Sequence, residues 1–176
     1  MGGSPKGLLP SPDTGQPLVA RALDLGHALG LDVALVGRAD AYRALAPDVP
    51  ALVDEAPDAG PLGGLCALLA WAGARPTIAL ACDMPAVSLD DLRALRDHPA
   101  DAAVIAARRA PDAPWEPLLA RYDAARVLPL ARARLARGER SLQGLLREAG
   151  VCDAELPARA CEDWDAPEDV RRSRTP

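Results

Sequence analysis

The chain is predicted to fold as an α/β domain, with a doubly wound, mostly parallel sheet and helices on both faces. Short apolar stretches alternate with amphipathic ones along the whole sequence, a pattern typical of parallel strands joined by right-handed helical crossovers. The five residues after Thr77, from Ile78 to Cys82, are all apolar or small, as expected of a strand buried on both faces. A length of 176 residues suits a single domain covering residues 1–176.

Periodicity and turn residues place the elements of the first half. Apolar residues recur at helical spacing over 18–29, and a short apolar run closes at Gly37. Pro61 suits the first position of a helix, directly after Gly60. These patterns predict helices over 18–29 and 62–71, a single helical turn over 42–45, and strands over 31–36, 51–53 and 78–82.

Caps and glycines divide the second half in the same way. Ser88 and Ser141 each stand directly before a helical run, where a serine side chain can accept a hydrogen bond from a free backbone N–H. Gly138 and Gly150 follow two of the runs and suit helix ends. We expect helices over 89–97, 124–137, 142–148 and from 167 onward, strands over 102–107, 116–122 and 151–156, and a proline-rich loop at 111–114.

Composition excludes several classes of function. The formal net charge is −5, so no basic field attracts nucleic acid, and the chain has no Phe and only three Trp and two Tyr, which argues against a surface that stacks bases. The four cysteines lack C-x-x-C spacing and only two histidines exist, which argues against a structural zinc site and favours thiols in a reducing compartment. With no apolar signal region and no run of 18 apolar residues, we expect a cytoplasmic protein with no membrane partner.

Two acids end predicted strands. Asp83 follows the buried strand 78–82, and Pro85 prevents the strand from continuing. In an open α/β sheet, ligands bind at the carboxyl ends of the strands. Asp83 could instead cap the next helix, but Ser88 is better placed for that role. Asp54 is the second such acid, after the strand 51–53.

Three small clusters add candidate functional residues. Residues 2–7 form a glycine-rich loop containing Lys6, which could cradle phosphates or could be a frayed terminus, and it lacks P-loop spacing. Gly63 and Gly64 each weaken a helix by about 1 kcal/mol relative to Ala, which indicates close approach of a ligand or of another backbone. Asp165 could cap a helix begun by Pro167 or carry a carboxylate toward a metal.

Six short motifs follow one another along the chain: M-G-G-x-x-K-G, D-x₅-G-P-L-x-G-L, C-D-M-P, E-P-L-x-A-x-Y, G-x-R-S-L and D-x-D-x-P-E-D. Their order and content resemble those of the molybdenum cofactor guanylyltransferases, which are nucleotidyltransferases with a Rossmann-like sheet. The resemblance covers essentially the whole chain. It implies transfer of GMP from GTP to the terminal phosphate of molybdopterin, with Mg²⁺ as cofactor and release of pyrophosphate. Proteins that deliver or receive the cofactor are possible transient partners.

The resemblance also implies roles for individual residues. Lys6 and Asp83 would be catalytic, and Asp83 would hold Mg²⁺ together with Asp165, which replaces an asparagine of the family pattern. The implied nucleotide-binding residues are Gly2, Gly3, Lys6, Asp54, Gly60, Pro61 and Asp83. Glu116, Pro117 and Arg140 would face the acceptor, although Arg140 could equally form a surface ion pair.

The largest departure from the family pattern is at the front. The pattern opens with a buried strand and an L-A-G-G loop before M-G-G, whereas this chain begins at Met1. We therefore expect a natural protein roughly 10 to 25 residues longer, enough for one strand and its loop. An in-frame stop codon directly before Met1 would contradict this expectation.

Two other functions remain open. The chain could use CTP and make the cytosine form of the cofactor, or act on another phosphorylated acceptor, although Met84 in C-D-M-P favours the guanylyl group. Alternatively, the chain as written could be a non-catalytic remnant that binds nucleotide without turnover.

Overall fold

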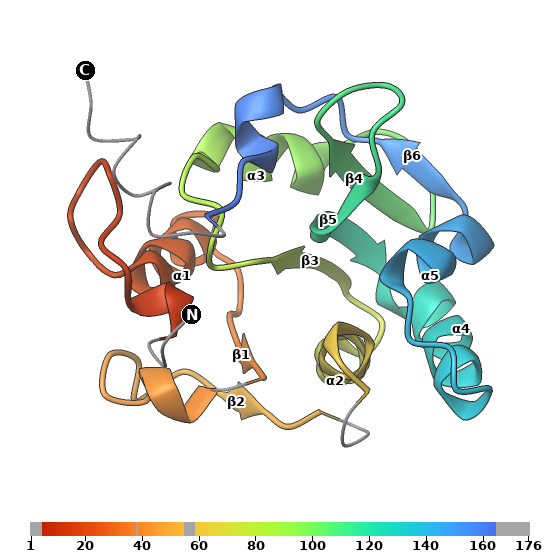
Figure 1. Cartoon of the computed structure of the whole chain (residues 1–176). Helices are drawn as coiled ribbons and strands as arrows, with labels where there is room; N and C mark the ends of the chain where they lie inside the picture. Colours follow the sequence, from red (N-terminus) through yellow and green to blue (C-terminus); the bar gives the residue numbers. More distant parts are fainter. Residues whose placement is uncertain (1–4, 38, 55–58, 165–176) are drawn as a thin grey trace.

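Six strands pair in two separate ladders in the structure, a computed structural model that describes residues 5–37, 39–54 and 59–164 (Figure 1). The smaller ladder joins β1 (Leu35–Val36) to β2 (Ala51–Leu52) in parallel. The larger ladder has the order β3-β5-β4-β6. Its strands are β3 (Pro76–Leu80), β4 (Val104–Arg108), β5 (Trp115–Asp123) and β6 (Val151–Asp153).

Strand direction and continuity refine the predicted sheet. β5 is antiparallel to both β3 and β4, and β6 is parallel to β4, so three of the four strands in the larger ladder run in one direction. The α/β class and the prevailing parallel direction are confirmed. The expected single sheet is not observed, because no strand of the described residues pairs with both β1 and β3.

The described residues also form five α-helices and three short 3₁₀ helices. The α-helices are α1 (Leu18–Ala28), α2 (Pro61–Ala72), α3 (Leu89–Asp97), α4 (Ala124–Ala136) and α5 (Leu142–Ala149). The 3₁₀ helices are η1 (Lys6–Leu8), η2 (Ala39–Tyr42) and η3 (Ala158–Cys161). Within the described part of the chain, no helix is both long and apolar enough to cross a membrane.

The helices begin where the sequence predicts. Ser88 caps α3 in a reciprocal capping box with Asp91, and the side chain of Ser141 accepts a hydrogen bond at the start of α5. Pro61 opens α2 directly after Gly60, which has a φ of 64°. Since Ser88 caps α3, the Asp83 side chain is not required to start that helix.

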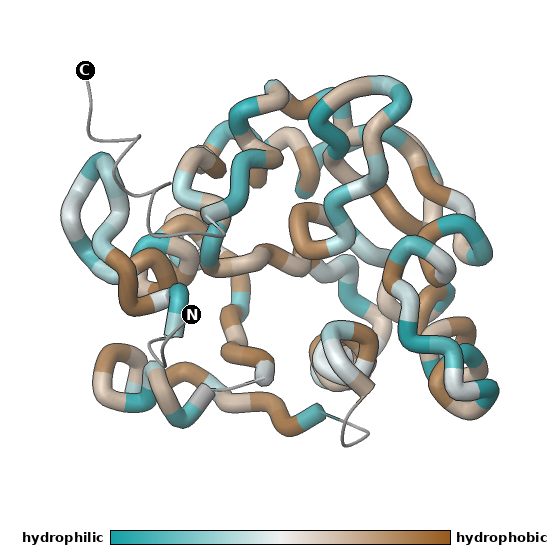
Figure 2. Tube along the Cα trace, viewed as in Figure 1, coloured by the Kyte–Doolittle hydropathy of each residue, from teal (hydrophilic) through white to brown (hydrophobic). Residues whose placement is uncertain are grey.

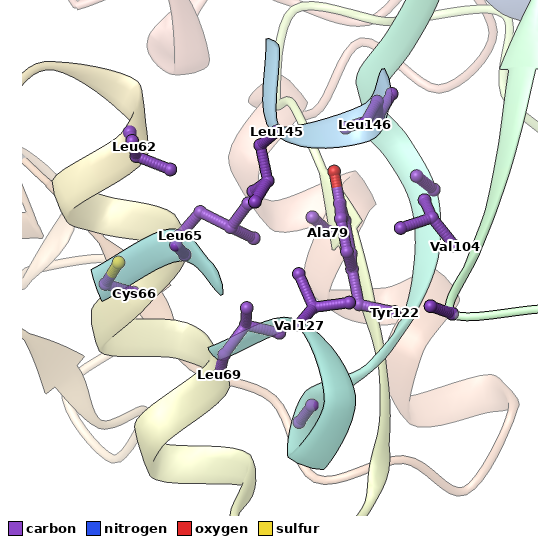
Figure 3. Packing of buried hydrophobic residues seen from close by; sticks show 14 of the residues in the cluster. Leu62, Leu65, Cys66, Leu69, Ala79, Val104, Tyr122, Val127, Leu145 and Leu146 are labelled. Atoms are coloured by element: carbon purple, nitrogen blue, oxygen red, sulfur yellow. The ribbon is translucent and has the colours of Figure 1, made fainter. Parts of the chain in front are cut away.

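Alternation along β4 shows that the sheet is covered on both faces. Val104 and Ala106 pack into a cluster formed with α2, α4 and α5, which Figure 3 shows from close by. Ile105 and Ala107 point the other way, into a cluster that contains residues of α3 and η3. Two apolar layers thus enclose the larger ladder, as predicted for a doubly wound sheet.

Some boundaries differ from the prediction. β1 is confined to 35–36 instead of 31–36, and β6 to 151–153 instead of 151–156, because a strand extends only as far as a neighbouring strand pairs with it. The predicted helical turn at 42–45 is present directly after η2, because the N–H groups of Leu45 and Ala46 both donate to the Tyr42 carbonyl, at 2.9 and 3.1 Å. Gly2, Gly3, Asp165 and the helix expected from Pro167 lie outside the described residues.

Candidate functional site

The carboxyl ends of β1, β2 and β3 open into one cavity of about 920 Å³. Gly37, Asp54 and Asp83, which follow these strands, all line it. The last backbone hydrogen bond at the end of β3 runs from the Ala81 N–H to the Leu118 carbonyl of β5, at 2.8 Å. Beyond that bond the chain leaves the sheet, so the Asp83 carboxylate is presented at the rim, as the sequence predicts.

Lys6 lies directly against Asp83. The Lys6 Nζ donates to Asp83 Oδ2 at 3.1 Å, and the two side chains are 34% and 23% exposed. The two residues are 77 positions apart in the sequence, and η1 brings Lys6 to the end of β3. The structure therefore joins the two residues predicted to be catalytic in one partly buried ion pair.

Tyr42 forms part of the same rim. Its ring packs on Gly7, where a Cβ would lie only 2.8 Å from the Tyr42 Oη. Its hydroxyl interacts with the Cys82 thiol and with the Gly7 backbone. Burial, followed by the neighbouring Cys82, raises the pKa of Tyr42, and burial followed by the charge of Asp83 raises the pKa of Cys82. Both groups are therefore protonated and neutral at pH 7.

Asp54 offers an oxygen atom that has no protein partner. Among the described residues, Asp54 Oδ1 is buried and accepts no hydrogen bond. A Cβ on Gly64 would lie 3.4 Å from this oxygen and 2.9 Å from Val36 Cγ1, so α2 approaches both β-strand ends closely. The close neighbours of Gly64 are thus side chains, whereas the sequence led us to expect a ligand or another backbone. An unsatisfied buried oxygen beside a cavity is suited to accept a hydrogen bond from a ligand.

The segment after η3 contacts the backbone of Asp83. The Trp164 N–H donates to the Asp83 carbonyl oxygen at 2.9 Å. Burial, then the nearby charge of Asp163, raises the pKa of Glu116. The Arg109 guanidinium forms an ion pair with Asp163, with Nη2 3.9 Å from Oδ1. Asp165, the predicted second metal ligand, follows Trp164 directly in sequence but lies outside the described residues.

The remaining predicted residues divide into two groups. Gly60 and Pro61 line the cavity at the amino end of α2. Glu116 and Pro117 precede Leu118, which also lines the cavity, and the Tyr122 hydroxyl fixes this part of β5 by donating to the Pro117 carbonyl at 2.6 Å. Arg140 is exposed in the turn between α4 and α5 and is not part of the cavity wall.

Two features of the site were not predicted from the sequence: the place of Tyr42 at the rim, and the nearness of Asp163 to Glu116. Tyr42 stands outside every motif, and its position depends on how η2 packs beside η1. The nearness of Asp163 to Glu116 depends on how the segment after η3 crosses the sheet.

The side chains at the rim suit a small hard cation. Asp83 supplies carboxylate oxygens, the type of ligand that Mg²⁺ prefers, and Mg²⁺ usually takes only one or two protein carboxylates plus phosphate oxygens and water. In the described part of the chain, no three His, Cys, Asp or Glu residues gather into a metal cluster. The donor set thus fits a divalent metal that shares its ligands with a bound phosphate compound.

An α/β sheet with a cavity at its strand ends, and a lysine paired with an aspartate there, defines a nucleotide-binding class of domain. The comparisons specify the family: the chain belongs to the MobA-like NTP transferase domain family, whose sequence profile matches residues 1–152.

Relatives and solved structures agree with this assignment. The chain is 36% identical over 171 residues to a molybdenum cofactor guanylyltransferase of Pseudomonas putida, covering 94% of this chain and 82% of that protein. It is 32% identical over 189 residues to a probable molybdenum cofactor guanylyltransferase of Methanothermobacter thermautotrophicus, covering 96% of this chain and 90% of that protein. The crystal structure of molybdopterin-guanine dinucleotide biosynthesis protein A from Archaeoglobus fulgidus has the same fold, with a TM-score of 0.72 at 19% identity over 91% of this chain and 85% of that one.

Proposed function

We propose that this protein transfers GMP from GTP to the terminal phosphate of molybdopterin and releases pyrophosphate, with Mg²⁺ as the metal. The observation that carries the proposal is the Lys6–Asp83 pair at the end of β3, in a chain that matches the MobA-like family over residues 1–152. The guanylyltransferase names of the relatives support the choice of GTP over CTP.

The proposed chemistry requires no protein nucleophile. A phosphate oxygen of molybdopterin attacks the α-phosphorus of GTP, a new P–O bond forms, and the bond to the β-phosphate breaks so that pyrophosphate leaves. Because both reactants are anions, the protein contributes mainly positioning and charge neutralisation.

The Lys6–Asp83 pair is expected to separate when substrate binds. Lys6 then places its ammonium group against the β- and γ-phosphates and offsets the charge of the leaving pyrophosphate. Asp83, released from Lys6, is proposed to hold the metal with phosphate oxygens, and Asp165 is proposed as a further ligand. When bound, Mg²⁺ would neutralise charge on the triphosphate. In the structure the ammonium occupies the place of a cation beside Asp83, at 3.1 Å from Oδ2.

The nucleotide is proposed to lie between the rim and the amino end of α2. Gly60 and Pro61 stand at this end, where the helix dipole and backbone N–H groups favour an anion. Gly2 and Gly3 are proposed to contact the phosphates from the other side. Asp54 Oδ1, which has no hydrogen-bond partner among the described residues, is proposed to accept a hydrogen bond from the nucleoside.

The acceptor is proposed to approach over β5, at Glu116 and Pro117. Burial, then the nearby charge of Asp163, raises the pKa of Glu116 above its ordinary value. Arg140 remains a proposed contact for the phosphate of molybdopterin. Transient contact with proteins that deliver or receive the cofactor belongs to the same proposal.

The direct test measures GMP transfer from GTP to molybdopterin in the presence of Mg²⁺. Asp83→Asn and Lys6→Met should each reduce the transfer rate at least about 100-fold while the far-ultraviolet circular dichroism stays unchanged, since removal of one preorganised charge typically costs that much. Asp90→Asn serves as the control, because Asp90 lies exposed on α3 and pairs with Arg93.

Three results would contradict the proposal. Full transfer by Asp83→Asn would remove Asp83 from the mechanism. A preference for CTP in direct competition would assign the protein to cytidylyl transfer. A folded protein that binds GTP but transfers nothing, with or without residues added ahead of Met1, would identify a nucleotide-binding protein without turnover.

A further inference from the structure

The loop between β3 and α3 carries Asp83 and has no regular secondary structure over residues 81–88. A hydrogen bond within it, from the Val87 N–H to the Met84 carbonyl, is long at 3.4 Å, so local pairing holds the loop weakly. The Met84 and Val87 side chains are buried in the apolar cluster that contains residues of α3 and η3. The polar backbone groups of this loop therefore need partners from other parts of the chain.

Three carbonyl oxygens of the loop accept hydrogen bonds from outside it. The pairs, given as donor and carbonyl, are Trp164 N–H with Asp83 at 2.9 Å, Arg159 Nη1 with Ala86 at 2.7 Å, and Arg21 Nη2 with Val87 at 2.7 Å. Two of the donors lie within residues 158–164, which comprise η3 and the segment directly after it. The path of the loop after β3 is therefore set by contacts with α1 and with residues 158–164.

The Arg159 guanidinium is itself oriented by a buried carboxylate. Asp91 is 5% exposed, and its Oδ2 and Oδ1 accept hydrogen bonds from Arg159 Nη1 and Nη2 at 2.8 and 3.2 Å. The same Oδ2 accepts a hydrogen bond from the Ser88 N–H at 2.8 Å in the capping box of α3. Arg159 thus connects the start of α3 with the Ala86 carbonyl, through the several donors of one planar group.

Arg159 also anchors the segment that contacts Asp83. η3 buries Cys161 in the apolar cluster, and the Cys161 carbonyl accepts a hydrogen bond from Arg109 Nη2 at 2.9 Å. Farther along the same segment, Trp164 is 6% exposed and its N–H binds the Asp83 carbonyl. A displacement of η3 would therefore disturb the loop at two points, one of them at Asp83.

Arg21 supports the far end of the loop. Its side chain is 14% exposed, and its Nε forms an ion pair with Asp13 Oδ2 at 3.0 Å. Asp13 belongs to the hydrophilic loop over 11–16 that precedes α1, seen as pale and teal segments in Figure 2. The carbonyl that Arg21 binds belongs to Val87, directly before the helix cap Ser88. Of the two arginines, Arg159 is the one whose own segment also contacts Asp83.

We propose that Arg159 is a positioning residue for the Asp83 carboxylate. By connecting η3 and the loop over 81–88 to Asp91, it holds Asp83 at the place where a divalent metal and the triphosphate would meet. This inference rests on the proposed function, in which Asp83 binds the metal. Arg159 acts only through the backbone around Asp83, as do the outer partners that orient metal ligands in other sites and contribute about 10- to 100-fold to metal affinity or activity.

A titration of GTP binding with Mg²⁺ tests this role without any need for turnover. In Arg159→Met, the Mg²⁺ concentration that gives half of the strengthening of GTP binding should rise about tenfold. The affinity for GTP without Mg²⁺ should stay at the wild-type value. Arg93→Met is the matched control, because Arg93 lies on α3, is 50% exposed against 48% for Arg159, and also pairs with an aspartate. Its Mg²⁺ titration should coincide with that of the wild type.

Two further variants separate positioning from stability. Arg159→Lys keeps a positive charge beside Asp91, but an ammonium carries its donors on one nitrogen and cannot reproduce the contacts of the guanidinium with Asp91 and Ala86. It should keep most of the urea midpoint that Arg159→Met loses, and still raise the required Mg²⁺ concentration severalfold. Ser141→Ala, which removes the cap of α5, should lower the urea midpoint and leave the Mg²⁺ titration unchanged.

The possible failures point to different conclusions. A Mg²⁺ titration of Arg159→Met that coincides with that of the wild type would overturn the positioning role and leave the proposed function intact. A shift of equal size in Ser141→Ala would overturn it as well, because the response to Mg²⁺ would then report a general loss of stability. GTP binding that does not respond to Mg²⁺ in the wild type would contradict the proposed function itself, and this inference with it.

Discussion

Replacing Gly64 by alanine tests whether the close packing of α2 against β1 is real. Within a helix, alanine is favoured over glycine by about 1 kcal/mol, so the change should stabilise the protein if space were available. Here the new Cβ would lie 2.9 Å from Val36 Cγ1 and 3.4 Å from Asp54 Oδ1. Carbon atoms pack best at about 3.5–4.0 Å, so Val36 must move.

The expected magnitude follows from these two opposing effects. Overpacking a well-ordered core by one methyl group costs about 1–3 kcal/mol, against the gain of about 1 kcal/mol in helix propensity. Gly64→Ala should therefore lower the free energy of unfolding by about 1 kcal/mol. In a Val36→Ala background the obstructing methyl groups are gone, and the same substitution should raise that free energy by about 1 kcal/mol.

Urea unfolding of the four proteins in this double-mutant cycle measures the coupling between the two positions. The expected coupling free energy is about 2 kcal/mol, within the range found for residues in direct contact. If Gly64→Ala stabilised the protein equally in both backgrounds, close approach to Val36 would not be the reason for glycine at position 64.

Three further predictions concern separate parts of the molecule. Burial opposes ionisation of Asp91, but hydrogen bonds from Arg159 and Ser88 outweigh it and lower the pKa of the carboxyl from its ordinary 3.8. The stability that Asp91 contributes is thus present above pH 3.8 and is lost as the pH falls through the lower folded-state pKa. In a plot of the urea midpoint against pH, Asp91→Asn should therefore flatten the decline on the acid side. An unchanged decline in the variant would refute this. Ser141→Ala should cost about 1 kcal/mol by removing the cap of α5, whereas Ser141→Asn should retain most of the stability in the same melting experiment. Asp54→Asn should leave the free energy of unfolding unchanged or slightly higher, since the buried Oδ1 has no partner within the described residues. The same substitution should weaken GTP binding about tenfold in a titration. Unaltered affinity for GTP would remove Asp54 from the nucleotide site.

Local signals in the sequence accounted for the element boundaries that depend on neighbouring residues. Ser88, Ser141 and Pro61 start helices through contacts within one turn, so their positions could be predicted without knowledge of the fold. The strand-end placement of Asp83 followed in the same way from a buried apolar run closed by Pro85. The expectation that Lys6 and Asp83 share one site came only from the resemblance, because no local rule links residues 77 positions apart, and their ion pair was not predicted.

Features that depend on long-range packing were not predictable. The antiparallel direction of β5 is set by its register between β3 and β4, and the periodicity of an apolar run carries no direction. The short extent of β1 reflects which strands pair with it rather than its β-branched sequence. Tyr42 reaches the rim because η2 packs beside η1, a contact between two segments that share no motif.

The central claim is that Asp83 and Lys6 form the nucleotide site at the end of β3. Equilibrium binding of GTP to the wild-type protein and to Asp83→Asn, each with and without Mg²⁺, tests it most directly. Mg²⁺ should strengthen GTP binding by at least about tenfold in the wild type, a difference of about 1.4 kcal/mol, and should have no such effect in Asp83→Asn. Equal strengthening by Mg²⁺ in both proteins would show that the metal and the triphosphate bind elsewhere.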